Sequence, residues 1–482
     1  MNLTNRVALK SILLVLLAGS LLSCGNKEER KAAYIERGKA YLIEKHYDNA
    51  RIEFDNVLKI DPEDAQAYLY RGETEEKRQN WAKAFADYSK ASELDPELIE
   101  ARIRLATFYL AQANALKVRN KASSAANVLA LGHRQIKEIR ARDPDNDEAA
   151  ALEATLWLTE GDVDRAIAQL ENVVARKPGL QLAAALLSSL YDRNGRADDA
   201  EVVLVTAVQS NPDPLFLQQR LAAHYEKLEQ NDKAERVLRQ IVRDNPEELS
   251  HRIALASFLA RTQQPDKADQ VLIEAIAVAD ELQHGLPGSA EGIAPKIVTV
   301  YSELARSRMA GGNLTGAAEA YADGLKKVPD DNGLMIGLAV VRERQRDYDA
   351  AIALYEKVLE KQPGNAFSTN NLAALLVDHR SDRASLARAA RLSVKLEKTG
   401  QPAFLDTAAW VYYRQGDYGK AAEILKGVVE KAPQVPVFQY HLGMTYYQQG
   451  DKVAARVHLE KATDGNADYP GIEEARAILK TL

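Results

Sequence analysis

Small residues, large apolar residues and prolines recur along this chain in a fixed order. The prolines are 34 residues apart within each of three groups, and a small residue stands twelve positions before each proline. Large apolar residues such as Phe54, Tyr88 and Leu170 lie close to these small residues. This order predicts pairs of antiparallel helices, because small side chains let two backbones approach and a proline ends the second helix. The prolines are Pro62 and Pro96; Pro144, Pro178, Pro212 and Pro246; and Pro329 and Pro363.

The spacing of 34 residues resembles the tetratricopeptide repeat (TPR), in which every unit is a pair of helices joined by a short turn. The turns within the pairs carry the expected signals, as in Gly161-Asp162 and Gly416-Asp417. We therefore predict an all-α fold, a TPR α-solenoid that forms a right-handed superhelix of about twelve helix-turn-helix units. Four of these units lack the proline and are placed by their small residues, Ala268, Ala387, Ala421 and Ala455.

The repeat phase slips at three places. The third unit has extra residues around 116–126, which predicts that both of its helices are lengthened. A second excess lies near Gly285, Pro287 and Gly288, whose residue types predict a loop. The third excess is a turn at 379–383. The predicted parts are an N-terminal array at 31–283, a loop insertion at 284–292, a C-terminal array at 293–469 and a capping helix at 470–482.

The N-terminus predicts export. Arg6 and Lys10 precede an apolar run at 12–22 that is short for a membrane-spanning helix, so residues 1–23 are predicted to be a signal peptide. Leu21-Leu22-Ser23-Cys24 resembles the bacterial lipobox, and the resemblance implies that Cys24 becomes the acylated first residue of a tether at 24–30. The alternative is that Cys24 is an incidental thiol behind an uncleaved signal anchor.

The lipobox resemblance also implies a location. Several acyl chains anchor a protein stably where one chain is marginal, so the lipid on Cys24 would hold the chain to a membrane. Gly25 and Asn26 follow the cysteine, and neither is the aspartate that retains many such lipoproteins at the inner membrane. We therefore expect the bacterial cell envelope, at the outer membrane and facing the periplasm. Cys24 is the sole cysteine, so no disulfide is expected.

Charge and motif content argue against nucleic acid binding and catalysis. The net charge is −6, from 63 basic and 69 acidic residues, with no long basic block that could bind phosphates. The eight histidines form no His-Glu-x-x-His pair, and no phosphate-binding glycine loop is present. We expect no enzyme activity, no metal and no cofactor besides the covalent lipid on Cys24.

The TPR resemblance implies which residues meet a partner, because positions two, five, nine, twelve and thirteen of each first helix line the concave face in that family. In the middle units these positions are often small or polar, as at Ala185 and Ser189. Aromatic, amide and arginine side chains there suit a peptide- or glycan-binding groove. The alternative is that these side chains pack between neighbouring helices. The last units place there Phe367, Asn370, Asp406, Trp410, Tyr413, Arg414, Tyr440, Met444, Tyr447 and Gln448.

The repeats from Leu405 through Gly416-Asp417-Tyr418 to His441-Leu442-Gly443-Met444 are similar to the last repeats of bacterial TPR lipoproteins associated with exosortase (PEP-CTERM) sorting and exopolysaccharide clusters. The resemblance implies a membrane-tethered periplasmic adaptor that gathers the proteins of an envelope secretion, polysaccharide-export or surface-assembly complex. Two alternatives stay open. One is a glycan-binding protein that guides polysaccharide, and the other is an adaptor for a periplasmic protease.

Overall fold

The computed structural model describes residues 27–285, 290–380, 382–465 and 469–482. Within these ranges the chain consists of helices and turns, with no strand, which confirms the all-α fold. The predicted signal peptide at 1–23 and Cys24 lie outside the described residues. The chain divides into two compact units, one ending at Gln230 and the other beginning at Asn231, and each is described by itself.

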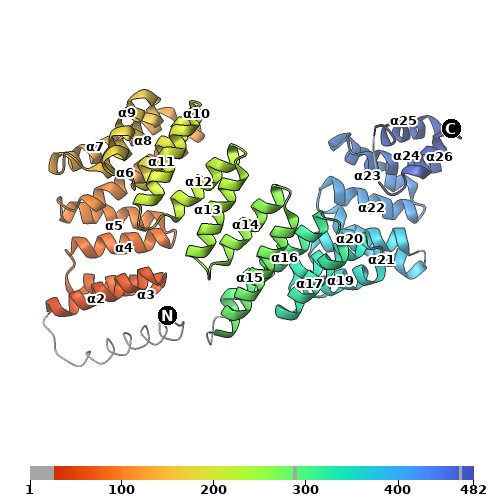
Figure 1. Ribbon diagram of the computed structural model, residues 1–482. Coiled ribbons are helices and arrows are strands. Elements are labelled where there is room, and N and C mark those ends of the chain that lie inside the picture. The colour runs from red at the N-terminus through yellow and green to blue at the C-terminus, as the bar shows by residue number, and fades with distance from the viewer. Residues whose placement is uncertain (1–26, 286–289, 381, 466–468) are drawn as a thin grey trace. The chain divides into compact units, whose positions relative to one another are not determined.

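In the first unit, helices pack against their neighbours in chain order (Figure 1). The two helices of a pair run antiparallel, and the first helix of each pair also meets the second helix of the preceding pair. The helices are α2 Lys27–Ile43, α3 Tyr47–Ile60, α4 Ala65–Lys77, α5 Trp81–Leu94, α6 Ile99–Val118, α7 Ala122–Arg142, α8 Asp147–Glu160, α9 Val163–Arg176, α10 Gln181–Arg193, α11 Ala197–Ser210 and α12 Leu215–Lys227.

The second unit repeats this arrangement and ends with a short terminal helix, α26, that packs on α24 and α25. Its helices are α13 Asn231–Asp244, α14 Leu249–Arg261, α15 Pro265–Gly285, α16 Ala290–Ala310, α17 Leu314–Lys327, α18 Asn332–Arg344, α19 Tyr348–Lys361, α20 Ala366–His379, α21 Arg383–Glu397, α22 Pro402–Arg414, α23 Tyr418–Lys431, α24 Pro436–Gln449, α25 Lys452–Ala462 and α26 Ile472–Leu479.

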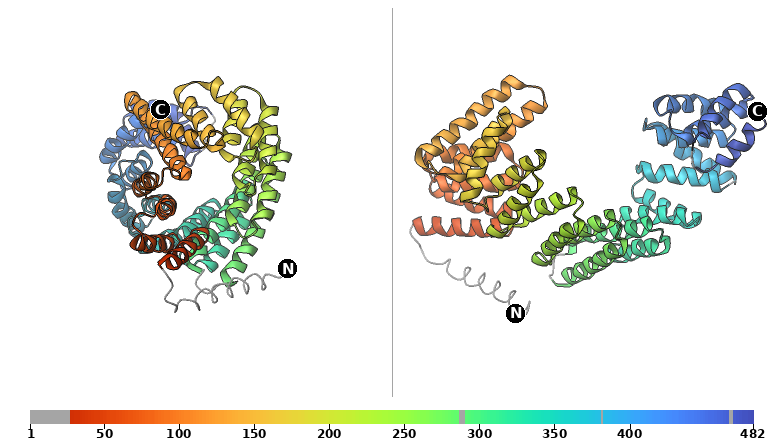
Figure 2. Two further views of the ribbon diagram at one scale, coloured as in Figure 1. Left: turned by 90° about the vertical axis from the view of Figure 1, so that its left-hand side faces the viewer. Right: turned by 45° about the horizontal axis from the view of Figure 1, so that its top comes forward.

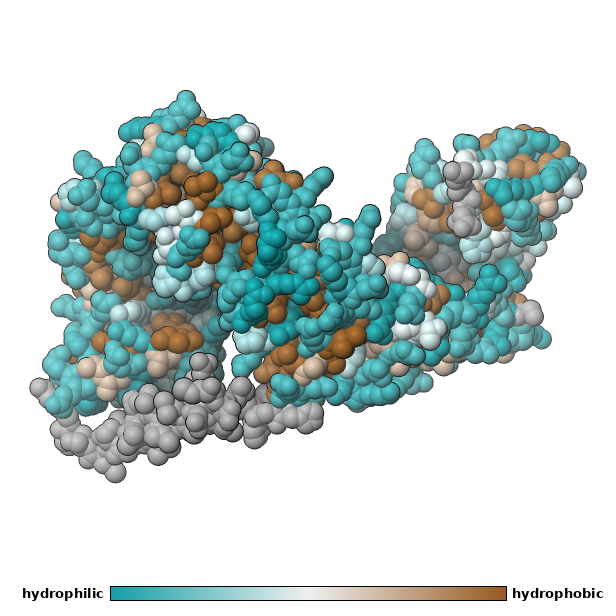
Figure 3. Space-filling model, viewed as in Figure 1, coloured by the Kyte–Doolittle hydropathy of each residue, from teal (hydrophilic) through white to brown (hydrophobic). Residues whose placement is uncertain are grey.

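The small residues of the repeat lie where the two helices of a pair touch. Ala50 and Ala84 are fully buried, and a Cβ added at Gly38 would lie 2.5 Å from a ring atom of Phe54. Such a distance leaves no space for a larger side chain, so the small residue sets how closely the helices approach. Apolar residues elsewhere reach the visible surface in separate groups among hydrophilic ones (Figure 3).

Four of the described helices are clearly longer than the others. Helices α6 and α7 have 20 and 21 residues, where most helices of the first unit have 13 or 14. Figure 2 shows this long hairpin in orange. Helices α15 and α16 have 21 residues each. The loop expected at 284–292 is therefore shorter in the structure, because helix extends to Gly285 and resumes at Ala290, and the segment lies inside the second unit.

The repeat phase at α21 differs from the prediction. Ala387 is exposed, whereas Ala389, two residues further on, is fully buried. Ala389 is therefore the small residue of this unit. Ser393 and Leu396, four and seven positions after it, are buried as well. The buried set Ala389, Ser393 and Leu396 has the same spacing as Ala351, Tyr355 and Val358 on α19.

The turn inside most pairs contains a residue with a left-handed backbone. Gly161 and Gly416 have φ angles of 98° and 83°, which glycine adopts without steric cost. The aspartate after each of them, Asp162 and Asp417, accepts a hydrogen bond from a backbone N–H in the first turn of the next helix. These caps satisfy donors that the helix itself leaves free.

Candidate functional site

Four of the predicted groove residues are buried in the second unit. Asp406, Trp410, Tyr440 and Met444 expose 5 %, 8 %, 3 % and 1 % of their surface. Asp406 and Trp410 belong to α22, and the other two belong to α24. Their side chains contribute to the packing between neighbouring first helices, so they do not line an open groove.

Trp410 is enclosed on both faces of its ring. The Tyr413 ring stacks on it at 4.2 Å between centroids, and the His441 ring stacks on it at 4.1 Å. The indole Nε1–H donates a hydrogen bond of 3.0 Å to Asp378 Oδ1. Because both faces and the polar edge are occupied within the chain, Trp410 offers no free ring face to a sugar or a peptide.

Asp406 and His441 form a second polar contact beside Trp410. The His441 Nδ1 lies 2.9 Å from both carboxylate oxygens of Asp406. Burial raises the pKa of Asp406, while the neighbouring His441 opposes the rise. Nothing bound from outside is needed to satisfy this carboxylate, so the pair joins α22 to α24.

The terminal segment covers Tyr440. The Tyr440 hydroxyl donates a hydrogen bond of 2.7 Å to Glu474 Oε2 on α26, and its ring contacts the Tyr469 ring. Burial raises the pKa of Tyr440, and the hydrogen bond to Glu474 raises it further. A Cβ at Gly471, whose φ is 101°, would lie 2.5 Å from the Tyr440 ring, so a larger residue there would push the segment away.

The other predicted residues are more accessible. Phe367 is 45 % exposed, Arg414 and Gln448 are exposed, and Asn370, Tyr413 and Tyr447 are half-buried. The structure therefore brings together Asp406, Trp410, Tyr413 and Tyr440 as an interhelical cluster. Repeat positions five and nine point to the concave face in the family. In this protein the side chains at these positions on α22 and α24 contact the neighbouring first helix instead.

A pocket of about 700 Å³ lies in the first unit, and the residue pattern did not single it out. We call it the α6–α10 pocket, because Ile103 on α6, Leu152 on α8 and Leu182 on α10 form its apolar part. The loop 178–180 and residues 210–212, at the end of α11 and just after it, complete the wall. Its size falls within the range of ligand-binding clefts in proteins.

The rim of the α6–α10 pocket carries more basic than acidic side chains. Arg104, Arg176 and Lys177 line it together with one carboxylate, that of Glu148. Lys177 Nζ is 3.7 Å from Glu148, and both side chains are about half exposed. Arg176 binds Asp147, and Arg104 Nε lies 3.0 Å from Glu100.

The family's concave-face positions on each first helix could have pointed to this pocket. Ile103 and Thr107 are at positions five and nine of their first helix, and Glu148 and Leu182 are at position two of theirs. Their types do not stand out from ordinary surface residues. The lengthened third unit was the available signal, because α6 belongs to it.

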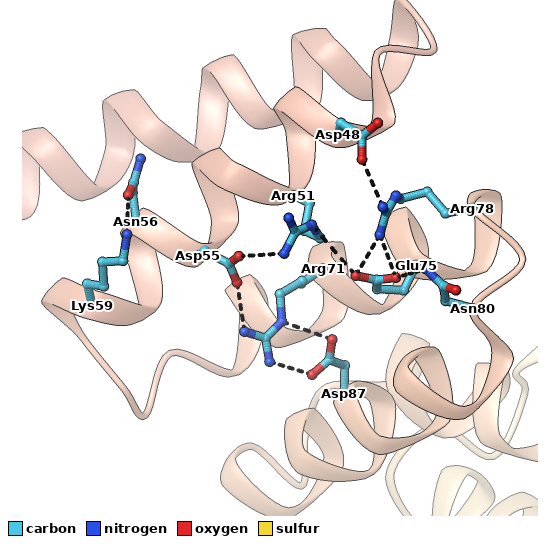
Figure 4. Close-up of polar contacts among 10 residues, drawn as sticks. All are labelled: Asp48, Arg51, Asp55, Asn56, Lys59, Arg71, Glu75, Arg78, Asn80 and Asp87. Atoms are coloured by element: carbon cyan, nitrogen blue, oxygen red, sulfur yellow. Dashed lines mark hydrogen bonds and ion pairs between the residues drawn. The ribbon is translucent and has the colours of Figure 1, made fainter.

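A charge network joins the first two helix pairs near a smaller pocket of about 230 Å³ (Figure 4). Arg71 donates two hydrogen bonds to Asp87, at 2.9 and 2.6 Å, and one of 2.9 Å to Asp55. Burial lowers the pKa of Arg71, but these two carboxylates more than reverse that effect. Burial raises the pKa of Asp87, which exposes only 7 % of its surface.

Glu75 is the other buried acid of this network. It is 3 % exposed and accepts hydrogen bonds from Arg78 at 3.0 Å and from Asn80 Nδ2 at 2.6 Å. Its oxygens are thus satisfied by residues of the same repeat. The described residues contain no group of three or more His, Cys, Asp or Glu side chains placed to hold a metal ion.

Among the described residues, no helix combines the length and the hydropathy that crossing a membrane requires.

Sequence comparison identifies the repeats. Two tetratricopeptide-repeat family models match the chain, one at residues 29–99 and 302–366 and the other at 157–225 and 412–479. A TPR repeat-containing protein of Pseudomonas aeruginosa is 32 % identical over 131 residues, which are 26 % of this chain. The chain spans only 21 % of the length of that relative.

The chain also resembles several solved structures. A thermophilic TPR protein of Thermus thermophilus is 21 % identical, with a TM-score of 0.35, and covers 40 % of this chain and 98 % of its own. The Cut9–Hcn1 hetero-tetramer of the APC/C is 12 % identical, with a TM-score of 0.38, and covers 92 % and 94 %. Yeast Tom70 is 16 % identical, with a TM-score of 0.32, and covers 95 % and 96 %. The family matches together cover more than half of the chain, which is a tetratricopeptide-repeat protein.

Proposed function

We propose that this protein is a scaffold that binds a segment of a partner protein in the α6–α10 pocket. TPR domains generally mediate protein–protein interactions, and this pocket supplies a site of suitable size. Ile103, Leu152 and Leu182 offer apolar contacts from three successive repeats. An extended segment bound there would contact three repeats at once.

The rim indicates the chemistry of that segment. Arginine has five N–H donors and lysine has three, and the ion pairs of Arg104 and Lys177 use few of them. A carboxylate can therefore bind these two side chains without displacing Glu100 or Glu148. We infer that the bound segment places an apolar side chain against Leu182 and an acidic group or a chain terminus at the rim.

A matched pair of substitutions tests the pocket. Leu182 is 37 % exposed within it, and Val202 on α11 is 64 % exposed and outside it. Leu182→Asp should abolish capture of specific proteins from cell extracts, because it places a charge on the apolar wall, whereas Val202→Asp should retain them. Quantitative mass spectrometry of the captured proteins is the measurement. If both variants capture the same set as the native chain, the pocket is not the binding site.

We propose further that the scaffold acts in a bacterial cell envelope, tethered by acylated Cys24. The support is the Leu21-Leu22-Ser23-Cys24 sequence behind a basic and then apolar leader. Growth with labelled palmitate should label the native chain and leave the Cys24→Ala variant unlabelled. An unlabelled native chain would exclude the tether.

The partner distinguishes among the envelope systems. Secretion, polysaccharide-export or surface-assembly proteins retained by the native chain and lost with Leu182→Asp would support the adaptor hypothesis. A protease retained in the same way would favour a protease adaptor. The glycan-binding alternative loses one of the two rings on which it depended, because Trp410 is enclosed on both faces, while Tyr447 is half-buried.

A further inference from the structure

Helix α21 has an exposed face with basic side chains and no acidic one. Arg383, Arg391, Lys395 and the C-cap residue Lys398 are all exposed. With 3.6 residues per turn, these four positions fall within about a third of the helix circumference. We call them the α21 basic face.

The charges of this face are not neutralised within the described part of the chain. Arg383, Arg391 and Lys398 make no hydrogen bond or ion pair there, and Lys395 donates only to the backbone oxygen of Pro363. Their cationic groups are therefore free to bind an anionic surface.

The carboxylates near α21 are engaged elsewhere. Glu356 on α19 pairs with Arg388. Glu397 accepts hydrogen bonds from Tyr412 and Lys420. Asp382 accepts the N–H groups of Ala384 and Ser385 as the helix cap.

The basic residues of this face are not needed for packing α21 against its neighbours. Helix α21 is buried through Ala389, Ser393 and Leu396, which lie on another side of the helix. The chain as a whole carries a net charge of −6, so a purely basic surface is a local departure from the average. Its one large apolar residue is Val394, which is 50 % exposed.

We propose that the α21 basic face binds the anionic surface of a phospholipid bilayer. Protein interfaces depend on a desolvated core, usually with aromatic anchors, and this face has no aromatic residue. An anionic lipid surface requires only basic side chains within reach of its headgroups, and each one strengthens binding by about fivefold. The face is about 22 Å long, the length of a 15-residue helix, and can contact several headgroups together.

Vesicle co-sedimentation tests the proposal. The experiment uses the full chain with the substitution Cys24→Ser, so that no acyl chain contributes to vesicle binding. The measured quantity is the ratio of binding to two kinds of vesicle, one of phosphatidylglycerol and phosphatidylcholine in a ratio of three to seven, the other of phosphatidylcholine alone. We expect a ratio well above one that falls as salt is added. Arg383→Gln, Arg391→Gln and Lys398→Gln combined should lower it on the order of a hundredfold.

A matched variant controls for net charge. Arg236, Lys431 and Lys452 are exposed, lie on three other helices and have no ion pair among the described residues. Changing these three to glutamine removes the same charge and should lower the ratio by less than tenfold. A variant with Arg383→Lys and Arg391→Lys should bind as the native chain does, which separates charge from any defect in folding.

Two results would overturn the proposal. The first is that the native chain binds both kinds of vesicle equally. Equal binding would overturn the proposal even if the face were found to capture an acidic protein instead. The second is an equal loss in the α21 variant and the dispersed variant, because the whole-chain charge would then explain the binding. The result does not depend on acylation of Cys24 or on the α6–α10 pocket.

Discussion

Replacing Gly443 by alanine measures how tightly the helices of a repeat pack. Gly443 lies on α24 at the point where α25 crosses it. An added Cβ would lie 2.8 Å from Leu459 Cγ, 2.9 Å from Cδ2 and 3.1 Å from the Leu459 backbone nitrogen. The backbone atom cannot rotate away, so the two helices must separate.

The expected change in the free energy of unfolding follows from two opposing effects. Alanine in place of glycine inside a helix stabilises by about 1 kcal/mol. Overpacking of a close contact destabilises by about 1–3 kcal/mol. At Gly443 both effects act, and we expect a net loss of about 1 kcal/mol. At Gly427 on α23 nothing lies within 4 Å of the added Cβ, so only the gain remains.

The assay must report on the last repeats alone, because helical arrays can unfold unit by unit and a single melting curve would average them. Native-state hydrogen exchange of amides in α23, α24 and α25 gives their local opening free energies. We expect exchange to slow in Gly427→Ala and to quicken in Gly443→Ala, with a difference of about 2 kcal/mol between the variants. Equal stabilisation of both variants would refute the reasoning, because no close approach at Gly443 could then exist.

Two further predictions concern charges. Arg71→Met should destabilise the first two repeats by about 2–3 kcal/mol in local hydrogen exchange, because Asp87 and Asp55 lose a shared partner. Lys83→Met, in the same pocket but without an ion pair in the described structure, should change stability by less than about 0.5 kcal/mol; equal effects would contradict the network. Burial lowers the pKa of His458, so its folded-state pKa lies below 6.5 and the α24–α25 pair should lose stability as pH falls through 6.5. His458→Gln should remove that pH dependence, and an unchanged profile would assign it to another group.

The fold was predictable because its signals are local. The small residue, the large residue and the proline of each repeat act within one helix pair, so their spacing predicted most of the pairs. At α21 the same signal was ambiguous, since Ala384, Ala387, Ala389 and Ala390 all lie near the expected position. Burial on the folded helix selects Ala389, and spacing alone could not.

The loop at 284–292 was overestimated for a different reason. Gly285, Pro287 and Gly288 predict a break in the chain, but they do not predict how far helix continues on either side. Ala279 on α15 and Ile297 on α16 are buried in the second unit, where these two helices pack against each other. That packing favours helix up to Gly285.

The candidate sites depended on contacts between repeats, which a repeat pattern does not specify. Trp410 occupies a position that faces partners in the family, yet its neighbours Asp378, Tyr413 and His441 enclose it. The α6–α10 pocket was missed because residues of three repeats form it. Their approach depends on how the repeats curve, and no single repeat encodes that curvature.

The Arg71 network limits how this array could be rearranged. A repeat whose contacts are only apolar can be duplicated, deleted or exchanged with little penalty, since any similar neighbour covers it. The second repeat supplies Arg71 and Asp87, while the first supplies Asp55. Removing the second repeat would leave Asp55 without Arg71. Inserting a copy of the second repeat between the two would leave one of the two arginines without the Asp55 carboxylate. We therefore expect the first two repeats to keep this network only when they are transplanted together.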